Sequence, residues 1–150
     1  MKRNLVIFFF LLFSACNSND KKTATIAEND IDAAREFIRS ALDGKFETAR
    51  IYLLDDSSNI QYITVAERNY QKADAETKYG YRNASIRIYS PVTYINDSTS
   101  IIVYSNSYKN DPDTLKVLKK NGQWLVDLKY LYEHDSDSIQ INKSNIDSLK

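Results

Sequence analysis

Apolar residues recur at helical spacing just after a polar N-terminal stretch. In the segment 30–42, apolar side chains follow Ile31 at offsets of 3, 7, 10 and 11, so they share one face of a helix. Asn29 or Asp30 can cap the start of this helix, and Gly44 can end it in the left-handed conformation. The pattern therefore predicts an amphipathic helix over 30–42.

Two further helices are predicted before the pattern changes. A short one covers 46–53, where apolar residues again keep helical spacing. The polar segment 55–59 (DDSSN) is typical of a loop. A third helix is predicted over roughly 64–78, because Thr64 and Glu67 match a capping box and the residues that follow favour helix.

After Gly80 the chain becomes β-branched and aromatic and alternates between apolar and polar residues. Pro91 lacks an N–H for a β-ladder, so a bulge, bend or edge is expected there. Asn121-Gly122 is a strong hairpin signal. Four strands are predicted, over 85–95, 100–108, 114–119 and 123–130.

The order of helices followed by strands with short turns predicts an α+β domain. Its helices should pack on one face of a four-stranded antiparallel sheet. This domain is expected over 29–134. The remaining segment, 135–150, is rich in Ser, Asn and Asp and is interpreted as a polar tail.

The N-terminus has the pattern of an export signal. Lys2 and Arg3 precede the apolar run 5–13 (LVIFFFLLF), whose nine residues are too few to span a bilayer as a helix. Small residues follow this run. The pattern predicts that residues 1–15 are a signal peptide.

The residues Ser14-Ala15-Cys16 resemble the bacterial lipobox, although Phe13 stands where that motif usually has Leu. The resemblance implies that Cys16 becomes the new N-terminus and carries acyl chains such as palmitate, which together anchor a protein stably. Residues 16–28 would then form the lipidated Cys and a flexible tether. Ser18 is not the Asp that commonly retains such lipoproteins in the inner membrane, so the outer membrane is favoured. The alternative is an ordinary secreted protein.

Charge and composition narrow the function further. The chain has 20 basic and 20 acidic residues, and loss of Lys2 and Arg3 would leave 18 and 20, a net charge of −2. Such a domain lacks the basic field that nucleic-acid binding requires. A single Cys precludes an intramolecular disulfide. The 11 tyrosines suit either a binding surface or half-buried strand positions, and the strand interpretation is preferred.

The order of elements resembles the NTF2-like (cystatin-like α+β cone) superfamily, and within it the small bacterial lipoproteins of the DUF4878 type. The residues that carry this resemblance are 34–42, the Asp-Gly-Lys-Phe-Glu-Thr-Ala segment 43–49, and Lys-Asn-Gly-Gln-Trp-Leu-Val at 120–126. The resemblance spans about 30–132. It implies a curved sheet that can enclose a pocket, and it supports the fold more than any activity.

Candidate chemistry is sparse. Steroid-isomerase relatives use an Asp or His base and a Tyr hydrogen-bond donor in the pocket, which makes Asp127 and His134 the obvious candidates. Asp127 alternates away from the apolar positions of its strand, so we expect it to be solvated. His134 lies among acidic residues without metal-ligand spacing, so no metal site and no cofactor is predicted.

Tyr52, Tyr70 and Trp124 are the candidate pocket residues, with ordinary core packing as the alternative interpretation. The leading hypothesis is a non-catalytic cell-envelope lipoprotein that binds a protein partner or a small apolar ligand. The alternative is a cone-fold enzyme of the isomerase or hydratase type. A third possibility is a structural surface protein without a ligand.

Overall fold

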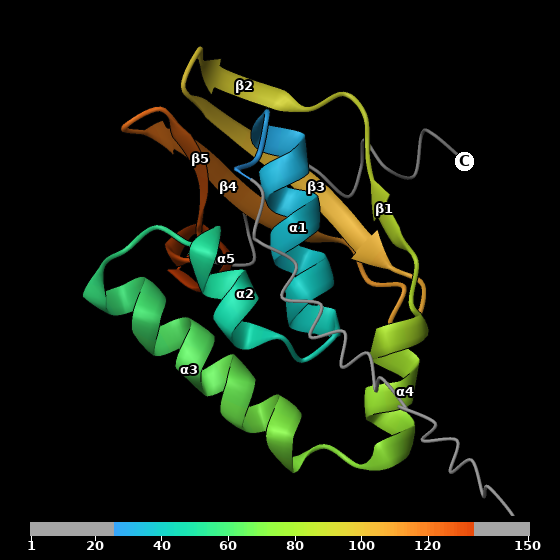
Figure 1. The fold of residues 1–150 in the computed structure, drawn as a ribbon. Helices are drawn as coiled ribbons and strands as arrows, with labels where there is room; N and C mark the ends of the chain where they lie inside the picture. Colours follow the sequence, from blue (N-terminus) through green and yellow to red (C-terminus); the bar gives the residue numbers. More distant parts are fainter. Residues whose placement is uncertain (1–25, 134–150) are drawn as a thin grey trace, which may run out of the picture.

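The computed structural model describes residues 26–133, which form five helices and one antiparallel sheet, with the first helix lying across the sheet (Figure 1). This confirms the predicted α+β class and the order of helices before strands. The described helices are α1 (Asp30–Leu42), α2 (Phe46–Ile51), α3 (Ser57–Lys72), α4 (Ala75–Asn83) and α5 (Lys129–Glu133). The strands are β1 (Ile86–Ile88), β2 (Thr93–Asn96), β3 (Thr99–Asn106), β4 (Asp113–Lys120) and β5 (Gln123–Asp127).

Helix α1 has the predicted bounds and crosses the sheet (Figure 1). The Asn29 side chain caps it by accepting a 2.9 Å hydrogen bond from the Asp32 N–H. The turn after α1 holds Gly44 at φ +76°, the left-handed conformation expected there. The face toward the sheet is fully buried and includes two alanines, which let the helix approach closely: Ala33, Ala34, Phe37 and Ile38.

The prediction of a single third helix is wrong. Helix α3 begins seven residues earlier, at Ser57, because Asp56 Oδ1 accepts a 2.9 Å hydrogen bond from the Asn59 N–H. The polar run predicted as a loop therefore forms a cap and a first helical turn. The expected capping box is absent, since Thr64 lies inside α3 and its hydroxyl donates to the Ile60 carbonyl at 2.6 Å.

A new cap also divides the predicted third helix. Asp74 accepts a 2.7 Å hydrogen bond from the Thr77 N–H and starts α4, which then runs to Asn83. Gly80, predicted to mark a boundary, lies inside this helix. The glycine has a packing role there instead, because the ring of Tyr108 occupies the space a Cβ would need.

The first predicted strand is divided into β1 and β2, so the sheet has five strands instead of four. Both pair antiparallel with the same edge of β3. The prediction of a bend at Pro91 is confirmed, since this residue lies between the two strands and has no N–H to donate.

The last two strands form the predicted hairpin. Asn121 and Gly122 have φ of +52° and +82°, and Lys120 pairs with Gln123. The predicted final strand ends early, at Asp127, and α5 follows. The free edge of β5 is covered by the chain after α2, where Val126 donates to the Tyr52 carbonyl at 2.8 Å and accepts from the Leu54 N–H at 2.9 Å.

The hydrophobic core lies between α1 and the sheet face that carries Ile102, Leu115, Val117 and Val126, all with no exposed surface. The tyrosines do not follow the preferred interpretation. Only Tyr94 and Tyr104 of the 11 lie in strands, whereas most of the others lie on helices or in the loops beside them. Within residues 26–133, no helix is both long and apolar enough to cross a bilayer.

Candidate functional site

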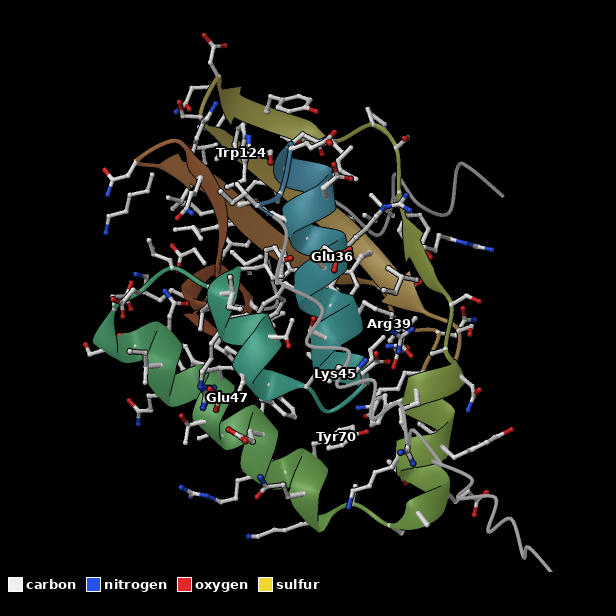
Figure 2. All side chains as sticks on the ribbon, in the orientation of Figure 1. Glu36, Arg39, Lys45, Glu47, Tyr70 and Trp124 are labelled. Carbon is white, nitrogen blue, oxygen red and sulfur yellow. The ribbon has the colours of Figure 1, made fainter. Side chains whose placement is uncertain are left out.

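The three predicted pocket residues do not come together. Tyr52 and Trp124 line one shallow hollow between the start of the domain, the end of α2 and β5. Tyr70 lies on α3 at the opposite end of the molecule from Trp124 (Figure 2). The hollow is lined by Ile26, Ala27, Ile51, Tyr52, Gln123, Trp124 and Leu125.

The hollow is too small for a drug-sized ligand. Its volume is about 30 Å³, whereas ligand pockets usually measure roughly 300–1,000 Å³. Tyr52 is 4% exposed, and burial, followed by the charge of Glu36, raises its pKa. Trp124 is half-buried, with the Lys119 ammonium 5.5 Å from its ring centre. This hollow can take a water molecule or the end of a side chain.

A group of aromatic rings surrounds Tyr70, and we call it the tyrosine surface. It consists of Tyr70 from α3, Tyr81 from α4 and Tyr108 from the loop after β3. Tyr81 meets Tyr108 edge-on with ring centres 5.1 Å apart and lies 6.3 Å from Tyr70. Tyr108 is 44% exposed, and Tyr70 and Tyr81 are half-buried. Sequence patterns missed this surface because its rings come from three separate segments.

Two glycines and two lysines hold the tyrosine surface in place. A Cβ on Gly44 would lie 2.5 Å from the Tyr70 ring, and one on Gly80 would lie 2.3 Å from the Tyr108 ring. Both rings therefore pack directly on bare backbone. The Lys78 ammonium lies 5.9 Å from the Tyr70 ring centre, and that of Lys109 lies 5.8 Å from the Tyr81 ring centre. The side-chain hydrogen bond with Tyr81 is the main cause of a raised Lys109 pKa.

Asp127 is buried, contrary to the prediction that it is solvated. It is 5% exposed, because the first turn of α3 covers this end of β5. Asn59, itself with no exposed surface, donates to Asp127 Oδ1 at 3.2 Å and accepts from the Leu128 N–H at 2.7 Å. The alternation of apolar and polar residues along β5 correctly placed Asp127 on the face opposite Val126. It could not show that α3, which is distant in the sequence, covers that face.

Asp56, Asn59, Asp127 and Lys129 form one polar group, which we call the Asn59 cluster. Asp56 Oδ2 accepts from the Asn59 amide at 2.9 Å and from the Lys129 ammonium at 2.5 Å. The N–H of Asn59 and then Lys129 lower the pKa of Asp56 to about 2, and Asp56 in turn raises the pKa of Lys129. With its carboxylate already engaged by Asn59 and Lys129, Asp127 is better suited to joining α3 to β5 than to accepting a substrate proton.

A second carboxylate lies beside tyrosines and was not among the predicted candidates. Asp113 at the start of β4 is directly opposite Tyr104 on β3. Burial is the largest cause of raised pKa values at Asp113, Tyr104 and Tyr132. The Tyr132 ring stacks on Tyr62 with centres 4.6 Å apart. The turn predicted at 110–113 would have placed other residues opposite one another. In the structure Tyr104 pairs with Asp113, so the connection from β3 to β4 is centred between Tyr108 and Lys109, and the sequence did not reveal this pair.

Other predicted positions lie outside the described residues. These are the lipid-attachment residue Cys16 and the candidate base His134, together with the tail 135–150. Within residues 26–133, no group of three or more His, Cys, Asp or Glu side chains is placed to hold a metal ion. In comparisons with known proteins, the chain matches no family model, no curated protein and no solved structure at a significant level.

Proposed function

We propose that this chain is a lipid-anchored protein of the bacterial cell envelope whose domain binds a protein partner and is not an enzyme. The export signal and the lipobox-like residues that end at Cys16 support the anchor, with the outer membrane as the favoured site. A helical layer followed by an antiparallel sheet, with α1 crossing it, is compatible with an NTF2-like cone.

The tyrosine surface is the observation that carries the binding proposal. Tyrosine is enriched at protein interfaces because its ring supplies a large contact area and its hydroxyl a directional hydrogen bond. Rings that already pack on Gly44 and Gly80 lose little conformational freedom when a partner binds. The two flanking lysines favour a partner with acidic residues opposite them.

The alternatives have weaker support among the described residues. The hollow at Tyr52 and Trp124, about 30 Å³, is too small for the apolar ligand first considered. An isomerase or hydratase is favoured by one observation, the carboxyl of Asp113 opposite Tyr104 with a raised pKa. That pair lies at the other end of the sheet from the hollow.

The anchor is tested by mass spectrometry of the mature protein from its native membranes. We expect an N-terminal peptide that begins at Cys16 and carries acyl mass. The Cys16→Ser variant should be soluble or remain unprocessed. A mature protein that retains its first 15 residues without acyl mass would contradict the proposal.

The partner surface is tested with a photo-crosslinking amino acid at Tyr108, the most exposed ring of the tyrosine surface. We expect a discrete protein adduct in membranes, and Tyr81→Ser should reduce its yield because the Tyr81 ring lies 5.1 Å from that of Tyr108 on the same surface. The matched control places the same probe at Ile60, a residue of similar exposure (47% against 44%) in the first turn of α3 and outside both surfaces. Equal adducts from both positions would contradict a specific surface.

A further inference from the structure

We propose that the Trp124 end of the domain lies on the lipid bilayer that holds Cys16, an inference that rests on the proposed anchor. We define this tryptophan end by its exposed apolar side chains and its indole: Ile26, Ile51, Tyr94, Ile95 and Trp124. It would contact the interfacial region of the membrane through apolar side chains and leave the tyrosine surface facing away from the lipid.

The first argument is the short reach of the chain. Ten peptide units separate Cys16 from Ile26, where the described structure begins. Even fully extended, ten residues span only about 33–36 Å. The surface around Ile26 is thus held within roughly one domain diameter of the headgroups, at a high effective concentration.

The second argument is the concentration of apolar side chains at this end. Ile26 and Ile51 are 66% and 55% exposed and border the hollow beside Trp124. The exposed β2 residues Tyr94 and Ile95, at 61% and 58%, lie at the same end of the sheet. The start of α1, β2 and the β4–β5 hairpin all lie together there (Figure 1). Tryptophan, tyrosine and aliphatic residues are the side chains that bind at a bilayer interface.

The charges show which kind of contact to expect. Lys119, stacked near Trp124, and the neighbouring Lys120 lie in the hairpin at this end. Glu28 and Asp32 at the start of α1 and Asp97 in the β2–β3 turn carry the opposite charge at the same end. Because these basic side chains do not outnumber the acidic ones, the membrane contact should be mainly apolar. It should depend little on salt or on anionic lipid.

Trp124 is the only tryptophan in the chain, so its fluorescence reports on this end alone. The experiment uses the full acylated protein in phosphatidylcholine vesicles whose acyl chains are brominated near the headgroups. We expect bromine to reduce Trp124 emission by about twofold or more compared with plain vesicles, as for an interfacial indole. The quenching should persist at high salt.

Matched variants identify the surface responsible. Ile26→Ser with Ile51→Ser should abolish the quenching, whereas Tyr79→Ser with Tyr108→Ser, at the other end, should preserve it. An acylated protein that floats with vesicles while its Trp124 emission is unaffected would overturn the docking and leave the anchor intact. A protein without acyl mass that does not float would overturn both. Quenching that disappears at high salt would overturn the apolar contact.

Discussion

The two ends of the sheet carry different kinds of exposed apolar residues. The tyrosine surface presents rings with hydroxyl groups, which pack on one another and on glycine backbone. The tryptophan end presents isoleucines around a shallow hollow and one indole beside a lysine. Both ends are partly apolar, but only the tyrosine surface combines fixed geometry with several directional hydrogen-bonding groups.

This difference separates specific from non-specific binding. A protein partner is recognised by rigid shapes and directional hydrogen bonds, and hydroxyl-bearing rings provide both. A bilayer has no fixed shape, so aliphatic side chains and one indole are sufficient to bind it. A protein tethered at Cys16 would then hold its partner-binding end away from the lipid.

The largest expected effect comes from Asn59→Ala, because Asn59 joins the helix that carries Tyr70 to the strand that carries Trp124. The substitution removes an amide with no exposed surface and leaves Asp127 and the Leu128 N–H short of partners. We expect the free energy of unfolding to fall by about 2–4 kcal/mol, measured by urea denaturation.

The control for this prediction is Asn69→Ala on the exposed side of α3, which should cost less than about 0.5 kcal/mol. If Asn59→Ala unfolds the protein no more easily than the control, the Asn59 cluster does not join the two ends. Both the tyrosine surface and the tryptophan end should lose their binding together when α3 separates from β5.

Glycine substitutions give an intermediate effect and separate packing from backbone strain. Gly44→Ala should reduce the free energy of unfolding by about 1–2 kcal/mol, since φ is +76° and a Cβ meets the Tyr70 ring at 2.5 Å. Gly122→Ala has a similar φ of +82° with nothing within 4 Å, so it measures the backbone cost alone. Equal losses for the two variants would show that Tyr70 moves aside freely.

Gly80→Ala affects the tyrosine surface more than the fold. Gly80 lies in a helix, where Ala is favoured by roughly 1 kcal/mol, and this offsets part of the clash with Tyr108. The half-exposed Tyr108 ring can turn outward. We therefore expect a change in unfolding free energy of at most about 1 kcal/mol together with weaker crosslinking from the probe at Tyr108.

Local patterns predicted the elements whose signals lie within a few residues. The 3.6-residue period fixed α1, Asn121-Gly122 fixed the hairpin, and Pro91 marked the break between β1 and β2. The error in α3 arose from a competition between two local signals. Asp and Ser favour loops and helix caps alike, and in this chain the cap at Asp56 starts the helix.

The binding sites were harder to predict because they are built from distant segments. Asp127 is covered by Asn59, which is 68 residues away in the chain. The tyrosine surface needs two helices and a loop to meet. Gly44 and Gly80 were recognised only as boundaries between elements, and nothing in the sequence showed that each supports a ring. Tyr52 and Trp124 do lie together, as expected of pocket residues, but whether the neighbouring space is a pocket depends on side-chain packing alone.

The smallest expected effects are on the pH dependence of stability. Replacing Asp113 and replacing Asp56 should change the free energy of unfolding in opposite directions, because the pKa of Asp113 is raised and that of Asp56 is lowered. Burial raises the pKa of Asp113, which lies opposite Tyr104, so its charged form is disfavoured in the folded protein. This cost is absent below pH 3.8 and grows as pH rises through the raised pKa, and Asp113→Asn should therefore stabilise the protein at neutral pH.

Asp56 has its pKa lowered to about 2, so its stabilising contribution is full above pH 3.8 and is lost as pH falls toward 2. Asp56→Asn should accordingly destabilise the protein at neutral pH, with the difference from wild type vanishing in acid. Thermal unfolding of both variants from pH 2 to 7 tests this pair of signs, and a loss of stability in Asp113→Asn at pH 7 would show that its carboxylate is needed in the charged form.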